Sequence, residues 1–227
     1  MRYLTLLFLF IISTTGFSQY PYILWHYDTQ DMAFGNSALD DIDNDNKPEI
    51  VFSCYRNDEK VHALNAENGS VLWTYNTNGC NDVAPLIYDV DGDNQLEVIL
   101  PSSCTPQTFC LNGLTGALEW SLPTRGSDSP PTLADIDNDG YPEILHGEFG
   151  GYVMCINAEM GTQAWEIPVD VNSWIQTAPV ITDLNGDNQL DFVVGNWNFD
   201  TSHTIFAYQG NNHAPLWTNH KPNDYMY

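Results

Sequence analysis

Four acidic nonapeptides carry the chemistry that the sequence encodes most clearly. In each of them, positions 1, 3, 5 and 9 hold a carboxylate or its amide equivalent. These side chains are Asp41, Asp43, Asp45 and Glu49; Asp89, Asp91, Asp93 and Glu97; Asp135, Asp137, Asp139 and Glu143; and Asp183, Asn185, Asp187 and Asp191. Two carboxylates about 5 Å apart repel by roughly 3 kcal/mol at an effective dielectric constant near 20. The spacing therefore predicts a cation site in each loop.

Calcium is the ion that fits these loops best, because it accepts about six to eight oxygen ligands in a flexible shell. Position 6 is always Asn or Gly, which tolerate the left-handed backbone of a tight turn. The main-chain carbonyl at position 7 is a further expected ligand, from Lys47, Gln95, Tyr141 and Gln189. We expect up to four Ca²⁺, one per loop, with the fourth loop the weakest because Asn185 and the shorter Asp191 replace stronger ligands.

The acidic loops have two other possible interpretations. An EF-hand needs a bidentate Glu at position 12, where this sequence has Phe52, Leu100, His146 and Val194, so that interpretation fails. The loops could also be solvated acidic turns without an ion, although four copies in register make this the weaker hypothesis.

The loops mark an internal repeat, with starts 48, 46 and 48 residues apart. A short apolar stretch precedes each loop and a continuous apolar run follows it, as in strands buried on both faces. A third apolar segment and a turn come next, and then a fourth strand ending in Trp73, Trp120, Trp165 or Trp217. This pattern predicts an all-β fold, a β-propeller with four-stranded antiparallel blades over about 35–76, 82–123, 129–168 and 176–219. A β-solenoid is the alternative.

Trp25 lies 48 residues before Trp73 and predicts an additional fourth strand over residues 20–28, without a blade of its own. We therefore expect residues 19–227 to form a partial propeller, a fragment of a larger ring of about seven or eight blades. Exposed sheet edges at both ends of such an array would favour aggregation.

The loop pattern resembles the FG-GAP/VCBS repeats of the integrin-alpha N-terminal propeller and its bacterial relatives, over residues 20–227. The resemblance implies that calcium sits between the first and second strand of each blade. The tripeptides typical of the family are only partly kept, as in Ala84-Pro85 and Ala178-Pro179. Residues 64–73 and 111–120 also resemble the outer strands of quinoprotein propellers, a packing likeness that implies no quinone.

The propeller topology places a second set of side chains on the face opposite the acidic loops. Trp174 and Trp197 fall outside the repeat positions, in loop connections. Their aromatic rings could stack on sugars, or they could cap the interior of the blades. Further candidates for ligand binding or loop ion pairs on this face are Arg56, Arg125, His146, Asp82 and Asp128. No spacing in the sequence commits to covalent catalysis.

Charge and the N-terminus indicate where the protein acts. A formal charge of −24 argues against binding nucleic acid or an anionic membrane surface. Residues 1–18 have a charged start, an apolar run and small polar residues, which predicts a cleaved signal peptide, export, and no membrane insertion afterwards.

An exported protein permits disulfides, and the sequence has five cysteines. Cys104 and Cys110 flank a hairpin and form the expected disulfide, Cys54 and Cys80 are a second possible pair, and Cys155 is expected as a buried thiol.

Together these features predict a secreted or cell-surface calcium-binding propeller that serves as a recognition or adhesion scaffold for a glycan or an extracellular protein. Calcium would be structural. The alternative is the propeller part of a secreted polysaccharide lyase or hydrolase, and a third possibility is an anchored structural protein. Whether the protein is an enzyme stays open at this point, and the lack of an evident catalytic constellation favours a non-enzyme.

Overall fold

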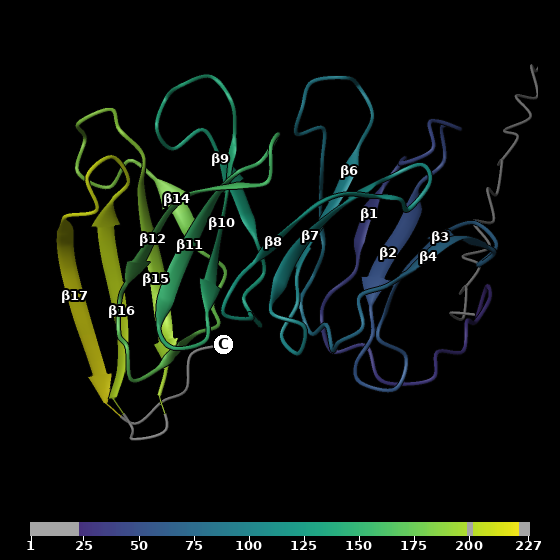
Figure 1. Cartoon of the computed structure of the whole chain (residues 1–227), viewed down its shortest axis with the longest axis horizontal. Coiled ribbons are helices and arrows are strands. Elements are labelled where there is room, and N and C mark those ends of the chain that lie inside the picture. The colour runs from purple at the N-terminus through teal and green to yellow at the C-terminus, as the bar shows by residue number, and fades with distance from the viewer. Residues whose placement is uncertain (1–22, 199–201, 223–227) are drawn as a thin grey trace, which may run out of the picture.

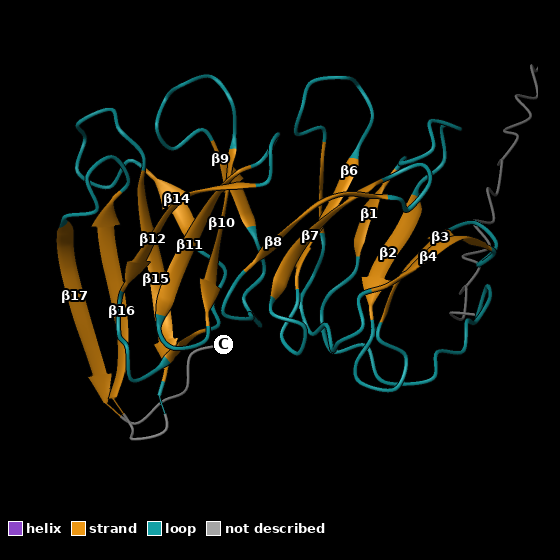
Figure 2. Cartoon of the chain, viewed as in Figure 1, coloured by secondary structure: helices purple, strands orange, loops and turns teal. Residues whose placement is uncertain are grey.

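The computed structural model describes residues 23–198 and 202–222, so the predicted signal peptide lies outside the described ranges. Every regular element in these ranges is a β-strand (Figure 2). None of the described residues forms a helix that could span a lipid bilayer.

The strands form four antiparallel sheets, each built from one sequence repeat (Figure 1). The first sheet contains β1 (Ala38–Asp40), β2 (Glu49–Ser53), β3 (Lys60–Asn65) and β4 (Val71–Asn76). The second contains β5 (Leu86–Tyr88), β6 (Glu97–Pro101), β7 (Gln107–Asn112) and β8 (Leu118–Pro123). The third contains β9 (Thr132–Ala134), β10 (Glu143–Glu148), β11 (Tyr152–Asn157) and β12 (Thr162–Pro168). The predicted all-β fold with four-stranded blades is confirmed.

The fourth sheet has an additional short strand. It contains β14 (Val180–Thr182), β15 (Asp191–Trp197), β16 (Ser202–Gln209) and β17 (Pro215–Pro222). Before β14, the strand β13 (Trp174–Ile175) pairs with the far end of β15. The inner edge of this blade is therefore a strand interrupted between β13 and β14.

The hydrophobic core is divided into layers that lie between consecutive sheets. One cluster joins Val51 and Val61 of the first sheet to Leu100 and Leu111 of the second. Two similar clusters join the second sheet to the third and the third to the fourth. In the two middle blades both faces of the second and third strands are covered by neighbouring blades, as the continuous apolar runs in the sequence predict. The first and fourth blades each have one such neighbour among the described residues.

A tryptophan in the outer strand of each of the first three blades packs against the next blade. The Trp73 indole Nε1 donates a hydrogen bond to the Gly113 carbonyl at 2.6 Å. A Cβ added to Gly116, whose φ is +67°, would lie 2.6 Å from the ring of Trp73. Only glycine fits beneath that ring. Trp165 instead packs against the imidazole of His213, at 4.4 Å between ring centroids. These tryptophans lie inside their strands, which continue beyond the predicted ends.

The predicted additional strand over residues 20–28 needs a correction. Residues 23–28 carry no strand, and residues 20–22 lie outside the described ranges. Among the described residues, no third strand of a preceding blade lies beside residues 23–28 to pair with them. Trp25 still docks on the first blade, where its Nε1 donates to the Ala66 carbonyl at 2.7 Å and its ring covers Gly69.

Candidate functional site

The acidic loops connect the first and second strand of every blade, and those of the second and third blades arch over the upper edge in Figure 1. Position 1 organises each loop by accepting backbone hydrogen bonds with both carboxylate oxygens. Asp41 Oδ1 accepts from the Asp45 amide at 3.0 Å, and Asp41 Oδ2 accepts from the Asn46 amide at 2.9 Å. In the other three loops Oδ2 of position 1 also accepts from the position 6 amide. Oδ1 accepts from the position 5 amide in the third loop and from the position 4 amides of Gly92 and Gly186 in the second and fourth.

Backbone conformation in the loops is also repeated. Position 6 has positive φ in all four, as the sequence predicted: Asn46, Asn94, Gly140 and Asn188. Position 4 has positive φ as well, at Asn44, Gly92, Asn138 and Gly186. The sequence analysis missed position 4, although the alternation of Asn and Gly there is the same signal.

Position 9 is buried and has one carboxylate oxygen free for an ion. Glu49 Oε2 accepts from the Ile42 amide at 3.0 Å, and the equivalent oxygens of the other loops accept in the same way. The second oxygen of Glu49, Glu143 and Asp191 is buried with no hydrogen-bond partner. A buried carboxylate oxygen without a partner is costly, and a bound cation would remove that cost.

The pKa values of the position 9 carboxylates also indicate a cation site. Burial, together with the charges of nearby acidic side chains, raises the pKa of Glu97 and of Glu143 to about 7. The same causes raise the pKa of Glu49. Without a cation, Glu97 and Glu143 hold a proton at a pH where an exposed Glu is fully ionised, and a divalent ion would favour the ionised form.

Three loops bring acidic oxygens close enough to share one ion. The groups are Asp41, Asp43 and Asp45; Asp89, Asp91 and Glu97; and Asp135, Asp137 and Glu143, each with its oxygens within 4.8 Å of one another. The fourth loop forms no such group among the described residues, because an amide stands at Asn185. The Asn185 side chain donates to Asp187 at 3.0 Å instead. The donors are all oxygens, as a hard cation such as Ca²⁺ prefers, so the residues present fit a calcium ion.

A groove lies on the face opposite the acidic loops. Its lining comes from the connections between strands 2 and 3 and between strands 4 and 1, which meet on that face. A hollow of about 220 Å³ is lined by Tyr55, Arg56, Phe149 and Trp174 together with the Cys80–Cys104 region. It shares Asp82 and Asp128 with a neighbouring cavity of about 460 Å³.

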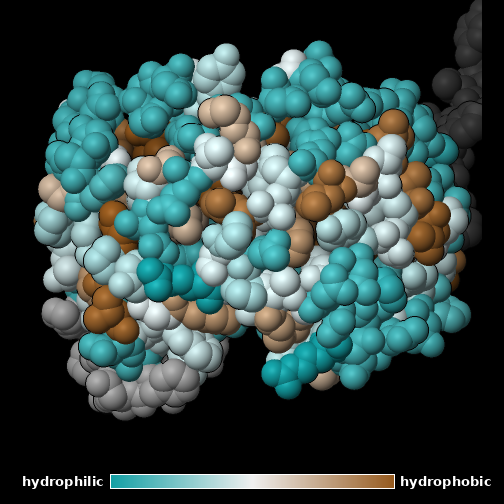
Figure 3. Space-filling view, viewed as in Figure 1, coloured by the Kyte–Doolittle hydropathy of each residue, from teal (hydrophilic) through white to brown (hydrophobic). Residues whose placement is uncertain are grey.

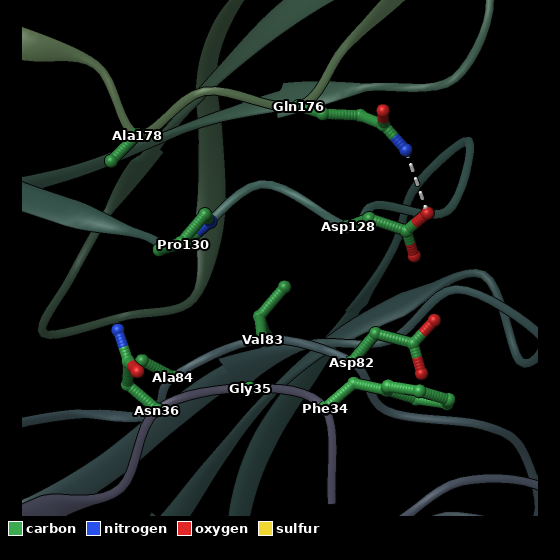
Figure 4. Close-up of a pocket in the computed structure, with 10 residues that line it drawn as sticks. All are labelled: Phe34, Gly35, Asn36, Asp82, Val83, Ala84, Asp128, Pro130, Gln176 and Ala178. Atoms are coloured by element: carbon green, nitrogen blue, oxygen red, sulfur yellow. Dashed lines mark hydrogen bonds between the residues drawn. The ribbon is translucent and has the colours of Figure 1, made fainter. Parts of the chain in front are cut away.

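The larger cavity is lined by equivalent positions of the four repeats (Figure 4). Phe34, Asp82, Asp128 and Gln176 each lie seven residues before position 1 of their acidic loop. Gln176 donates to Asp128 Oδ2 at 3.0 Å. Burial, and then the charge of Asp128, raise the pKa of Asp82 to about 6, and burial raises the pKa of Asp128. The two aspartates were predicted on this face, whereas Phe34, Tyr55 and Phe149 were missed. The signal that could have found them is the repeat spacing, since Phe34 is equivalent to Asp82, and Tyr55 and Phe149 each lie 14 residues after position 1 of their loop.

Trp174 and Trp197 are brought together rather than spread over separate connections. They face each other as a cross-strand pair between β13 and β15, with ring centroids 5.2 Å apart. Trp174 also packs on Phe149 at 4.6 Å. Both tryptophans are half-buried, so a partly exposed aromatic ladder borders the groove.

Of the other predicted ligand residues, Arg125 is on this face and His146 is not. The Arg125 guanidinium binds both carboxylate oxygens of Glu166, at 2.7 and 3.1 Å, and stacks on the Tyr152 ring. His146 is fully buried in β10 and contacts Thr108 Oγ1 at 2.9 Å. Its burial lowers the pKa to about 4. The placement of His146 on the ligand face was wrong, because the alternation of β10 turns this side chain into the space between blades.

The predicted cysteine pairs also need correction. Cys104 is bonded to Cys80, with 5.0 Å between their Cα atoms, and not to Cys110. Cys110 points into the core from β7, whereas Cys104 lies in the loop beside Cys80, where the Ser103 amide donates to the Cys80 carbonyl. Cys54 is a buried free thiol, so the alternative pair was wrong as well. The prediction that Cys155 is a buried free thiol is confirmed.

The repeat that these loops define is similar to a known family. Residues 89–146 match the FG-GAP-like repeat. The match spans the second acidic loop, the rest of its blade and the third acidic loop, so it agrees with the repeated geometry described above. No curated protein matches the chain by sequence.

Solved structures share the propeller-type fold at low identity. BamB from Moraxella catarrhalis is 17% identical with a TM-score of 0.57, covering 86% of this chain and 64% of its own. A quinohemoprotein alcohol dehydrogenase from Pseudomonas putida HK5 is 15% identical with a TM-score of 0.60, covering 86% and 35%. The V. cholerae biofilm matrix protein Bap1 is 21% identical with a TM-score of 0.52, covering 90% and 44%. The chain thus spans about a third to two thirds of these structures, and the likeness shows the fold alone.

Proposed function

We propose that this protein is an extracellular recognition scaffold for adhesion, in which calcium rigidifies one face and the opposite groove binds a glycan. The observation that carries the proposal is the groove itself. Tyr55, Phe149 and Trp174 offer aromatic surface beside Arg56 and the Asp82–Asp128 pair. Aromatic rings stack on the apolar faces of sugars while charged groups bind their hydroxyls, which is the mixture that a glycan site requires.

Three further observations support this assignment. The segment 1–18 has the composition of a signal peptide. The Cys80–Cys104 disulfide is typical of proteins in oxidising environments outside the cytoplasm. Among the structures with this fold, one is named as a biofilm matrix protein. Extracellular calcium modules bind at about 10⁻⁴–10⁻³ M, so the acidic loops would be filled outside a cell.

The recognition role is tested by glycan-array binding of the full chain in calcium. We expect Arg56→Ala and Trp174→Ala each to reduce binding at least about tenfold, because each removes a contact worth about 1.4 kcal/mol or more. Leu114→Ala is the matched control, since this exposed apolar side chain lies in a turn on the other face. Unchanged binding by Arg56→Ala, an exposed position where the fold is not at risk, would refute the site.

The structural role of calcium is tested separately by thermal unfolding. Excess EGTA should lower the melting temperature by about 5 °C or more for each filled loop, because a loop filled at one hundred times its Kd contributes about 2.7 kcal/mol. The same melting curve with and without EGTA would refute calcium and leave the groove proposal standing.

A second candidate function is glycan hydrolysis. It is favoured by Asp82, whose pKa of about 6 suits a general acid and which faces a second carboxylate in the same cavity. Release of reducing sugars from array-positive glycans, abolished in Asp82→Asn, would establish it. Binding without any release would exclude it.

A further inference from the structure

A buried cluster in the first blade differs in chemistry from the acidic loops. It consists of Cys54, just after β2, Asp58 in the following connection, and His62 in β3. All three side chains are buried, at 0%, 5% and 3% exposure. The thiol sulfur, a carboxylate oxygen and an imidazole nitrogen lie within 4.8 Å of one another. We propose that Cys54, Asp58 and His62 bind a zinc ion.

The donor set selects zinc over calcium. Sulfur, nitrogen and oxygen donors together suit a borderline metal held in tetrahedral geometry, whereas Ca²⁺ takes oxygen ligands almost alone. Three protein ligands leave one position for water or another small ligand. A cavity of about 230 Å³ borders Asp58 and His62, so an ion and its water ligand have a path to the cluster.

Contacts of both ring nitrogens orient His62 so that Nε2 points into the cluster. Tyr27 Oη lies 3.2 Å from His62 Nδ1, and His62 Nε2 lies 2.5 Å from Asp58 Oδ2. Without metal, the Nε2 proton joins the imidazole to the carboxylate. Zinc would take the place of that proton once the two donor atoms move apart, since two tetrahedral ligands about 2.0 Å from zinc lie about 3.3 Å from each other. Nδ1–H would then donate to Tyr27. A ligating His commonly donates its other ring N–H to such a partner.

The carboxylate is also held in a way that leaves one oxygen for the ion. Lys60 Nζ binds Asp58 Oδ1 at 2.6 Å, so Oδ2 remains directed at His62. Lys60 is partly exposed and keeps its contact without entering the cluster. The other free thiols, Cys110 and Cys155, belong to no comparable group of metal-binding side chains among the described residues.

The test uses the full chain in saturating calcium, so that the acidic loops are occupied, and titrates it with Co²⁺ as a spectroscopic substitute for zinc. A thiolate ligand gives an intense sulfur-to-cobalt charge-transfer band, which oxygen-only sites cannot give. We expect one equivalent of Co²⁺ to produce the band and one equivalent of Zn²⁺ to remove it.

Variants identify the ligands. Cys54→Ser should abolish the band, while Cys155→Ser, the matched control at a buried free thiol, should keep it. His62→Gln, whose amide can still donate to Asp58, should weaken Zn²⁺ binding at least about 100-fold, and Tyr27→Phe about tenfold. If Cys54→Ser fails to fold, His62→Gln decides the outcome. No band in the unaltered protein, a band that survives Cys54→Ser, or equal zinc affinity in His62→Gln would each overturn the proposal and leave the cluster as a hydrogen-bonded core.

Discussion

Replacing Glu97 with Gln should change the stability of the protein in opposite directions with and without calcium. Burial, and then the neighbouring acidic charges, raise the Glu97 pKa in the folded state to about 7, from about 4.5 for an exposed Glu. The folded state therefore holds the proton more tightly than the unfolded chain. The stability that this proton provides is complete below pH about 4.5 and is lost as the pH rises through 7.

The magnitude follows from that pKa difference. Keeping Glu97 ionised in the metal-free loop costs about 3 kcal/mol at pH 8. Gln keeps a carbonyl oxygen for the Val90 amide, which Glu97 binds at 2.9 Å, and removes the charge. In EGTA at pH 8 we expect the variant to be up to about 3 kcal/mol more stable than the unaltered protein. Calcium at one hundred times its Kd returns about 2.7 kcal/mol to the intact loop, so the advantage of the variant disappears there and reverses at higher calcium.

Urea unfolding at pH 5 and pH 8, with EGTA or calcium, measures all four conditions. Asp28→Asn is the control, since it also removes one negative charge, at an exposed position outside the acidic loops. If Glu97→Gln destabilised the protein equally in EGTA and in calcium, the carboxylate would be a structural hydrogen-bond acceptor and not an ion ligand.

Three other perturbations test the packing between blades. Gly116→Ala should cost about 3 kcal/mol in urea unfolding, because it adds a collision with Trp73 to a positive φ. Gly150→Ala has the same backbone strain but only ordinary contacts with Tyr152, at 3.9 Å or more, and should cost about 1 kcal/mol. Equal losses would contradict the docking role of Trp73. Reduction of the Cys80 disulfide, which closes a separation of 24 residues, should cost about 3 kcal/mol; an unchanged urea midpoint would show that it is not formed. Burial lowers the pKa of His146 to about 4, so the side chain is neutral in the folded protein. Its contribution to stability is complete above pH about 6.5, and about 3 kcal/mol is lost as the pH falls through 4. His146→Gln should therefore flatten the acid side of the curve of unfolding free energy against pH, and an unchanged curve would contradict this role of His146.

The acidic loops could be predicted in detail because their information is local. Each loop closes on hydrogen bonds between residues two to five positions apart, such as the Asp45 and Asn46 amides on Asp41. The surface in Figure 3 is largely hydrophilic, with apolar residues in separate patches, as expected for blades that bury their apolar runs against each other. The propeller class was predictable for the same reason, since each repeat carries its own turns and apolar strands.

The disulfide and the buried cluster were not predictable from spacing, whereas the groove was predictable in part, since Arg56, Asp82 and Trp174 were expected on its face. Cys80 and Cys104 belong to different connections, and which thiol meets which depends on how one blade is rotated against the next. His146 and His62 differ in the same way: both are strand histidines, but one faces Thr108 between blades and the other meets Asp58 and Tyr27.

Residue order alone therefore specifies four similar blades, their acidic loops and their oxygen donors, because backbone hydrogen bonding and hydrophobic periodicity act over a few residues. The assembly of blades specifies the groove walls, the Cys80–Cys104 bond and the surroundings of each buried titratable side chain. Those features depend on distances between segments far apart in the chain, and packing of one sheet on the next determines these distances.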